Sequence, residues 1–295
     1  MKPTGKIALP TLVMAVSLSA ASVATATLPG GNGVIAFGRG SVQSDIWTVT
    51  SHSVTQQLTA TATPREAMPD WSGDGTKVAY SRCGPSESSN CEIWSMNADG
   101  GGQTRLTNSP TQETWPTWSP DGTKIAYTSN ALDPFQDIWV MDANGANQTR
   151  LTATSAFDAY PEWSPDGATI VFTSDRSAPD DIWVMDANGA NPTRLTTGSK
   201  VDDYPDWSPD GTQITFTRNG NIWSMLADGS AQTQLTVKHR AEFASTYSPN
   251  GTRIAFNREG KDGRFGVWTM PADASGPAKQ LTFGKFDFFP DWQPL

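Results

Sequence analysis

Short apolar runs recur along the chain, and each is bounded by residues that favour turns. In the stretch A-Y-P-E-W-S-P-D-G-A-T-I from Ala159, the first run ends at Ser164–Gly167, which has Pro and Gly where a type I hairpin turn prefers them. Residues 169–173 are β-branched and aromatic, residues 182–185 form another apolar run, and a second turn signal, D-A-N-G, precedes residues 193–196. The unit predicts four short strands, a to d in chain order, without a helical period.

Close copies of this unit repeat along the chain. The phrase P-x-W-S-x-D-G returns from Pro69, Pro116 and Pro205, with a looser copy from Thr246. A second phrase, D-I-W-V-M-D-A-N-G and then T-R-L-T, accompanies the first, and its Trp lies at positions 47, 94, 139, 183, 223 and 268. Steps of 40 to 47 residues between these tryptophans are typical of four-stranded β-propeller blades.

The first and last units predict how the ring closes. The phrases I-A-F at 35–37, D-I-W at 45–47 and Q-L-T at 57–59 lack a preceding P-x-W-S phrase, whereas the chain ends with F-P-D-W-Q-P at 289–294. The C-terminal run therefore supplies strand a of the N-terminal unit. The sequence predicts an all-β, six-bladed β-propeller of four-stranded antiparallel blades, and closure by the C-terminal strand removes exposed sheet edges.

The N-terminus has the pattern of an export signal. Residues 1–26 contain two lysines, an uncharged run rich in Ala and Val, and an A-T-A cleavage site, as expected of a signal peptide. An uncleaved anchor is the alternative, but the strongly apolar part, residues 7–18, is shorter than the roughly 20 residues of a membrane span. We therefore expect residues 27–295 to be one propeller domain, exported to the periplasm or the medium and not inserted in the membrane.

The chain is acidic, with a net charge of −9 that becomes −11 when Lys2 and Lys6 are removed with the signal peptide. Such a charge disfavours nucleic acid and anionic membranes as partners and favours cations or basic peptides. The alternative is that the acidity only keeps an exported protein in solution.

Two cysteines, Cys83 and Cys91, flank the segment G-P-S-E-S-S-N between strands b and c of the second unit. In an exported protein, a pair at the two ends of one hairpin loop predicts a disulfide. A metal site is disfavoured because no His lies near, and a redox pair would have the spacing C-x-x-C.

The phrases P-x-W-S-P-D-G, D-I-W-V-M-D-A-N-G and T-R-L-T resemble the repeats of the TolB-like β-propellers, over about residues 33–295. The resemblance implies a six-bladed propeller, an exported location and a channel mouth that binds peptide segments of partner proteins. TolB itself has an additional α/β domain ahead of its propeller, and this sequence shows no pattern for one.

The repeats also predict two unlike faces. The S-P-D-G and D-A-N-G turns join a to b and c to d, which places them together on one face, here called the constant face. The b–c and d–a connections form the opposite, variable face, because their lengths and sequences differ from blade to blade. Variable loops on a rigid scaffold commonly carry binding sites, although unconstrained drift would give the same pattern.

Every predicted strand a has an acidic residue five positions before its aromatic residue, and we call these six the strand-entry acids: Glu66, Glu113, Asp158, Asp202, Glu242 and Asp287. We expect them to ring the channel mouth. Hairpin register places one residue of strand b opposite each acid, in the same order: Arg82, Ser129, Ser174, Arg218, Arg258 and Arg39. Opposite charges across an antiparallel pair ordinarily stabilise a sheet, so the four acid–arginine pairs are predicted to be structural.

Glu113 and Asp158 face only serines, which makes them the candidates for binding. Carboxylate and hydroxyl oxygens suit calcium, and carboxylates also receive Lys, Arg or an α-amino group. We predict that an acidic arc binds a cation, tentatively calcium held by Glu113 and Asp158, or a basic peptide. The alternative is a solvated acidic rim. The arc comprises Glu113, Ser129, Asp158, Ser174, Asp202 and Asp203.

The remaining aromatic and polar residues divide between core, turns and surface. The repeated tryptophans are predicted to pack between neighbouring sheets. The turn aspartates Asp74, Asp121, Asp166 and Asp210 are predicted to bind turn N–H groups. Outside the repeated phrases, the ring candidates for ligand contact are Phe135, Phe265 and Phe286.

The sequence contains few residues that could act as catalytic groups. His52 and His239 are the two histidines and are predicted on opposite faces, and no G-x-S-x-G motif is present. The sequence therefore favours a monomeric, non-catalytic module that binds a protein or peptide at the acidic channel mouth. The alternative is a calcium-dependent hydrolase, similar to a lactonase or esterase, with its metal at that mouth.

Overall fold

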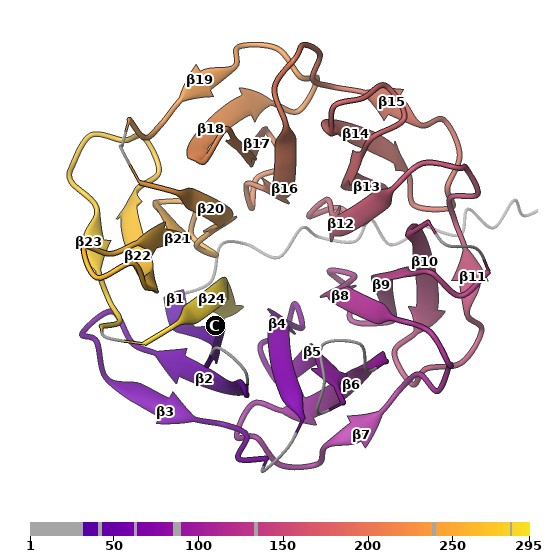
Figure 1. Cartoon of the computed structure of the whole chain (residues 1–295), viewed down its shortest axis with the longest axis horizontal. Coiled ribbons are helices and arrows are strands. Elements are labelled where there is room, and N and C mark those ends of the chain that lie inside the picture. Colours follow the sequence, from indigo (N-terminus) through magenta and orange to yellow (C-terminus); the bar gives the residue numbers. More distant parts are fainter. Residues whose placement is uncertain are drawn as a thin grey trace, which may run out of the picture.

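The computed structural model describes residues 32–40, 43–61, 64–84, 90–132, 135–237, 240–283 and 285–295. These residues form 24 strands in six sheets, and each sheet is one blade of a ring around a central channel (Figure 1). No α-helix occurs within the described ranges. The predicted all-β, six-bladed propeller is confirmed.

Each blade contains four antiparallel strands in the spatial order a, b, c, d, with strand a at the channel. Blade 1 consists of β24 (Asp287–Pro294), β1 (Asn32–Arg39), β2 (Asp45–Val49) and β3 (Thr55–Gln57). Blade 2 consists of β4 (Arg65–Trp71), β5 (Lys77–Cys83), β6 (Cys91–Asn97) and β7 (Thr104–Arg105). Blade 3 consists of β8 (Glu113–Trp118), β9 (Lys124–Ser129), β10 (Asp137–Asp142) and β11 (Thr149–Arg150).

The second half of the ring repeats the same order. Blade 4 consists of β12 (Asp158–Trp163), β13 (Thr169–Ser174), β14 (Asp181–Asp186) and β15 (Thr193–Arg194). Blade 5 consists of β16 (Asp202–Trp207), β17 (Gln213–Arg218), β18 (Asn221–Leu226) and β19 (Thr233–Gln234). Blade 6 consists of β20 (Glu242–Tyr247), β21 (Arg253–Glu259), β22 (Phe265–Pro271) and β23 (Lys279–Gln280).

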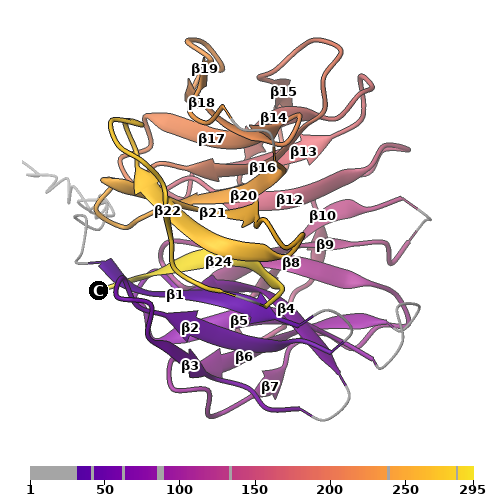
Figure 2. The ribbon, with the colours of Figure 1, turned by 60° about the vertical axis from the view of Figure 1, so that its left-hand side comes forward.

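The ring closes between the two ends of the chain. The last strand, β24, pairs antiparallel with β1, in a register that sets Arg39 opposite Asp287 and Ile35 opposite Trp292. Figures 1 and 2 both show the two strands side by side. The C-terminal strand therefore completes the N-terminal blade, as predicted.

The core lies between neighbouring blades rather than within any one of them. The cluster between blades 3 and 4, for example, combines Ala126 and Ile138 with Trp163, Ile170 and Phe172. The tryptophans at the ends of β4, β8, β12 and β16 are 5% to 9% exposed, and the strand-c tryptophans pack at the edges of the same clusters. Burial of these large side chains stabilises each interface, which confirms their predicted core role.

The constant-face turns follow the predicted chemistry. In the β8–β9 turn, Ser119 donates to Asp121 Oδ1 at 2.6 Å, and the Thr123 N–H donates to the same oxygen at 3.0 Å. Equivalent bonds hold Asp74, Asp166 and Asp210. These bonds, led by the serine hydroxyl, lower the pKa of the turn aspartates, because each bond favours the ionised carboxylate.

Other predictions outside the channel have mixed outcomes. Cys83 and Cys91 form a disulfide with an S–S distance of 1.99 Å. His52 lies in the exposed β2–β3 turn, whereas His239 and the predicted signal peptide, residues 1–26, lie outside the described residues. No helix within the described ranges is long and apolar enough to cross a membrane.

Candidate binding site at the central channel

The strand-entry acids occupy the register positions that the hairpin spacing predicts. Each lies opposite the expected residue of strand b: Glu66 opposite Arg82, Glu113 opposite Ser129, Asp158 opposite Ser174, Asp202 opposite Arg218, Glu242 opposite Arg258, and Asp287 opposite Arg39. All six are at most 2% exposed. They are therefore buried carboxylates, which contradicts the alternative of a solvated acidic rim.

The reason is the direction in which the carboxylates point. Arg218 Nη2 lies 2.5 Å from Asp202 Oδ2, and its guanidinium stacks over the ring of Trp223 on strand c. A carboxylate that reaches such a guanidinium points outward along the blade, away from the channel. The predicted structural pairs are present at N–O distances of 2.5 to 2.6 Å, and they join Glu66 to Arg82, Asp202 to Arg218, Glu242 to Arg258 and Asp287 to Arg39.

Asp158 also has a cation, which the register argument missed. Arg176 Nη2 lies 2.7 Å from Asp158 Oδ2, and the guanidinium stacks over Trp183. This arginine lies two residues beyond Ser174, in the β13–β14 loop, so it cannot be found from the residue directly opposite the acid. Asp158 is therefore not an unpaired carboxylate. The guanidinium of Arg176 lies where a calcium ion bound to Asp158 was expected.

Glu113 remains without a cation among the described residues. It is 2% exposed, and its Oε2 is buried without a hydrogen-bond partner. Burial raises the pKa of Glu113, nearby hydroxyls of Thr107 and Ser109 lower it, and the carboxylate of Glu92 raises it again. Within the acidic arc, arginines therefore hold Asp158 and Asp202, whereas Glu113 has only hydroxyl groups and the carboxylate of Glu92 beside it.

The channel wall is built by a bulge that every blade repeats. In β4, Met68 and Pro69 together lie opposite the single residue Tyr80, because the pairing passes from Ala67 directly to Asp70. The residue before each Pro, or before Ser245 in blade 6, has a positive φ of 51° to 57°: Met68, Trp115, Tyr160, Tyr204, Ala244 and Phe289. Bulky residues rarely adopt this conformation, and bulges re-aim side chains.

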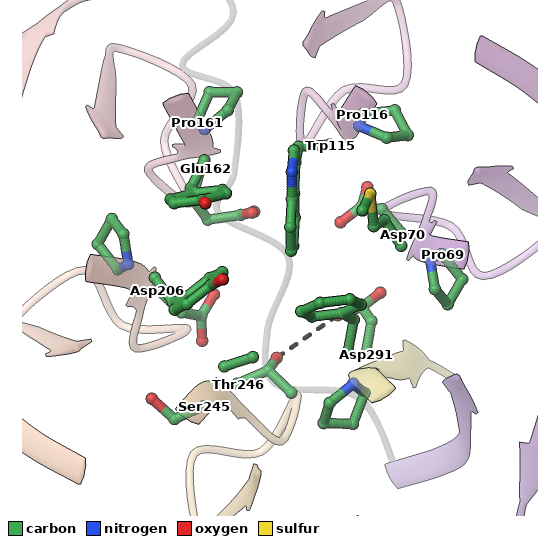
Figure 3. Close-up of a pocket in the computed structure, with 17 residues that line it drawn as sticks. Pro69, Asp70, Trp115, Pro116, Pro161, Glu162, Asp206, Ser245, Thr246 and Asp291 are labelled. Atoms are coloured by element: carbon green, nitrogen blue, oxygen red, sulfur yellow. Dashed lines mark hydrogen bonds between the residues drawn. The ribbon is translucent and has the colours of Figure 1, made fainter. Parts of the chain in front are cut away.

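Four of the six bulge residues are aromatic, and we call them the aromatic collar: Trp115, Tyr160, Tyr204 and Phe289. The ring of Trp115 lies 4.5 Å from that of Phe289 and 4.6 Å from that of Tyr160, and Tyr160 stacks on Tyr204 at 4.4 Å. Because Trp115 belongs to blade 3 and Phe289 to blade 1, the rings meet across the channel. Figure 3 shows Trp115 standing at its centre. The collar therefore constricts the channel.

Two residues after each bulge residue lies a second ring of polar side chains, nearer the constant face. Its four acids, the channel carboxylates, are Asp70, Glu162, Asp206 and Asp291 (Figure 3). The Trp118 N–H donates to Asp70 Oδ2 at 2.7 Å, and the Thr117 hydroxyl donates to Glu162 Oε1 at 2.9 Å. Asp206 and Asp291 likewise accept the N–H of an aromatic residue of the next blade at 2.7 Å. These bonds tie neighbouring blades together at the channel.

The channel carboxylates share an environment that resists ionisation. Burial raises the pKa of each, and their mutual repulsion raises the values of Asp70, Glu162 and Asp206 further. The pKa of Asp291 is raised to about 7, mainly by burial. With the collar they enclose a cavity of about 100 Å³, whose described lining contains no Lys, Arg or His. No three His, Cys, Asp or Glu side chains in the described ranges could jointly hold a metal ion.

On the variable-face side of the collar, further aromatic rings extend the apolar surface over blades 6 and 1. Phe243 lies 5.9 Å from Phe289 and 5.1 Å from Phe265, whereas Phe286 stacks on Phe288 at 6.2 Å. These rings are partly exposed. The expectation that Phe265 and Phe286 lie near the mouth therefore agrees with the structure.

Asp203 lies beside the collar on the same side. Its Oδ1 is buried without a hydrogen-bond partner, and burial raises its pKa to about 7, with further contributions from Asp180 and Asp202. Burial raises the pKa of Tyr160, and the carboxylates of Asp203 and Asp180 raise it further. Because Asp202 is paired with Arg218, Asp203 is the member of the acidic arc that faces the mouth.

Reasoning from the sequence missed the collar and the channel carboxylates, although a signal was present. Each bulge residue comes immediately before the first residue of the P-x-W phrase, and each channel carboxylate comes immediately before its Trp. All six residues before the Trp or Tyr of this phrase are Asp, Glu or Thr: Asp70, Thr117, Glu162, Asp206, Thr246 and Asp291. The phrase reads as a plain strand, and only the bulge turns these positions toward the axis.

Comparison with known proteins agrees with this architecture. A family model described as TolB beta propeller domain matches residues 131–220 and 178–295. A comparison with curated proteins finds no match. TolB from Acinetobacter baumannii is 21% identical, with a TM-score of 0.77 over 89% of this chain and 67% of its own. A putative TolB from Agrobacterium tumefaciens is 22% identical, with a TM-score of 0.69 over 90% and 92%.

A chain of the nidogen/laminin complex is 13% identical, with a TM-score of 0.72 over 89% of this chain and 98% of its own. At these identities the solved structures are similar in fold alone. The family matches, in contrast, cover residues 131–295, more than half of the sequence. The chain therefore belongs to the TolB beta propeller domain family.

Proposed function

We propose that the protein is an exported, non-catalytic module that binds a protein or peptide at the variable-face mouth of its channel. The observation that carries this proposal is the bulge with positive φ at a non-glycine residue in all six blades. Such a conformation costs on the order of 1–3 kcal/mol per residue and is concentrated at functional sites. The conformation is repeated in all six blades and places a large side chain in the channel in five of them, which favours a binding role for those side chains.

The chemistry of the mouth indicates the kind of partner. The collar, together with Phe243, Phe265 and Phe288, offers partly exposed rings, and aromatic residues dominate the energetics of protein interfaces. Asp203 and Asp180 add carboxylates with raised pKa values and no cation among the described contacts. A segment with an aromatic or aliphatic side chain beside a Lys, Arg or α-amino group would complement both features.

Two further observations support the proposal. The disulfide between Cys83 and Cys91 suits an oxidising compartment, as expected of an exported protein. The structural relatives include TolB and a chain from a protein–protein complex.

The ion pairs of the strand-entry acids revise the acidic arc. Asp158 and Asp202 are held by arginines, so Asp203 and Glu113 are the arc residues proposed for binding.

The test is selection of a displayed random peptide library on residues 27–295. We expect enriched peptides to combine a basic residue with an aromatic or aliphatic residue. Substitution of Tyr204 by Ala should weaken their binding by tenfold or more, because truncation of a central aromatic anchor typically costs about 2 kcal/mol or more. Asp203→Asn should also weaken binding, and this effect should shrink as salt is raised.

The matched control is Asp121→Asn, which removes one carboxylate charge from the constant face, where Asp121 binds its own turn. It should leave peptide affinity unchanged. Failure to enrich any peptide would contradict the proposal. Equal affinities of selected peptides for the wild type and for Tyr204→Ala would contradict it as well.

A further inference from the structure

Five of the six blades contain the same three-part stack. An arginine bridges the buried strand-entry acid and the face of the strand-c tryptophan. The guanidinium carbon lies 4.0 to 5.2 Å from the tryptophan ring centre, and the stacks pair Arg39 with Trp47, Arg82 with Trp94, Arg176 with Trp183, Arg218 with Trp223 and Arg258 with Trp268. The ion pair and the cation–π contact act on the same guanidinium, so the stack is a built guanidinium site.

Blade 3 has the same frame without the arginine. Its acid is Glu113, its strand-c tryptophan is Trp139, and Tyr127 lies opposite Trp139 in the sheet. Ser129 occupies the register position that Arg82 holds in blade 2. Ala131 occupies the place of Arg176 in blade 4, two residues beyond the serine. Neither position therefore supplies a cation to this frame.

The charges around Glu113 are also unbalanced. Its carboxylate lies next to that of Glu92, and Arg105 is ion-paired with Glu92. At the border of blades 3 and 4, by contrast, Asp137 and Asp158 each have an arginine, Arg150 and Arg176. The Oε2 of Glu113, a residue that is 2% exposed, has no hydrogen-bond partner. The blade 3 frame thus lacks one positive charge that its neighbour has.

We propose that the blade 3 frame, formed by Glu113, Ser129 and Trp139, receives an arginine side chain from the bound partner. The inference rests on the proposed binding function and specifies a chemical feature of the partner. A planar guanidinium fits because it stacks on an aromatic ring and binds a carboxylate at its edge, as the protein's own arginines do in the other blades.

The position can be reached from outside the protein. In the other blades, the bridging arginines keep 10% to 15% of their side-chain surface exposed, although their acids are almost completely buried. A guanidinium at this depth therefore lies at the surface of the variable face. Lysine is a poorer fit, because its ammonium does not stack on the tryptophan face in the same way.

The test compares two blocked peptides, acetyl-Phe-Arg-Phe-amide and the same peptide with citrulline, whose uncharged side chain has nearly the same shape. Binding to residues 27–295 is followed by titration with NMR detection of tryptophan indole N–H signals. We expect the arginine peptide to bind at least tenfold more tightly and to shift the Trp139 signal. Equal affinities, or no binding of either peptide, would overturn the inference.

Two matched variants test whether the preference for arginine arises at the blade 3 frame. Ser129→Arg supplies an internal guanidinium beside Glu113, as Arg82 does beside Glu66, and should bring the affinity ratio of the two peptides close to one. Ser174→Arg adds the same charge in blade 4, where Asp158 already has Arg176, and should retain the tenfold ratio. An unchanged ratio in Ser129→Arg would contradict the inference.

The outcome can be separated from that of the proposed function. If library-selected peptides bind Ser129→Arg as tightly as the wild type but lose affinity for Tyr204→Ala, the channel mouth is the binding site and the arginine frame is not used. If they lose no affinity in either variant, the proposed function itself fails.

Discussion

Two rings of acidic side chains are carried by the same inner strands, four residues apart, and they differ in charge compensation. In β16, Asp202 points outward to Arg218 at 2.5 Å, whereas Asp206 points into the channel and accepts the Tyr247 N–H at 2.7 Å. The outer ring has an arginine in five blades. The four channel carboxylates have no cation in their described cavity lining, and each has a raised pKa.

The difference shows how one strand serves two purposes. The outer acids and arginines neutralise each other and join strands a, b and c within a blade. Three of the channel carboxylates accept a backbone N–H of the next blade and Glu162 accepts the Thr117 hydroxyl, but their charges remain unbalanced. A carboxylate paired inside its own blade is a structural element, and an uncompensated one at the channel is available for protons or for a ligand.

The largest expected effect is the loss of an outer arginine. Arg218→Met should lower the free energy of unfolding by about 3–5 kcal/mol, because it leaves the buried carboxylate of Asp202 without its cation. Denaturant unfolding measures the change. The control is Arg264→Met, whose pair with Asp262 is about half exposed at 3.9 Å, and which should cost less than about 1 kcal/mol. Equal costs would remove the distinction between the outer pairs and surface pairs.

A smaller effect concerns the inner ring and pH. The pKa of Asp291 is raised to about 7 from 3.8, so its contribution to stability is present below about pH 4 and is lost as pH rises through about 7. The free energy of unfolding should therefore fall between pH 5 and pH 7, by up to about 1.4 kcal/mol per pH unit for this group. Asp291→Asn should flatten this slope.

Urea unfolding at pH 5, 6, 7 and 8 measures the slope. The control is Asp121→Asn, because the pKa of Asp121 is lowered and its stabilising contribution is lost only as pH falls below its ordinary value of 3.8. Its slope in the window from pH 5 to pH 7 should equal that of the wild type. A steep slope that persists in Asp291→Asn would show that this carboxyl group does not carry the pH dependence.

The smallest effect is a gain. Ser129→Arg should raise the free energy of unfolding by up to about 1 kcal/mol, because an opposite charge across an antiparallel pair stabilises by about 0.2–1 kcal/mol. Thermal or denaturant unfolding measures it. Ser174→Arg should give no gain, since Asp158 is already paired. A gain of the same size in both variants would mean that added positive charge alone stabilises this acidic protein.

The fold could be predicted from the sequence because its determinants are local. The P-x-W-S-x-D-G phrase contains its own turn, and the fixed distance from that turn gives cross-strand partners such as Asp202 and Arg218. The missing first strand and the extra last one predict closure of the ring for the same reason. Register arithmetic fails only where a loop supplies the partner, as Arg176 does for Asp158.

The channel could not be predicted in this way because it depends on backbone geometry. Period-two alternation assigns a strand residue to one face or the other, but the bulge at Trp115 breaks that alternation and turns the ring into the channel. Whether rings from different blades meet depends on the width of the closed ring. The contact of Trp115 with Phe289 is therefore a tertiary result.

The most direct test of the central claim is to locate a bound peptide on the two faces. A library-selected peptide with a photoreactive phenylalanine analogue would be crosslinked to residues 27–295, and the attachment sites would be identified by mass spectrometry. The account predicts crosslinks at the collar and its neighbours, such as Tyr204 and Phe243. Crosslinks concentrated at the constant-face turns, for example around Asp121 or Asn144, would contradict it.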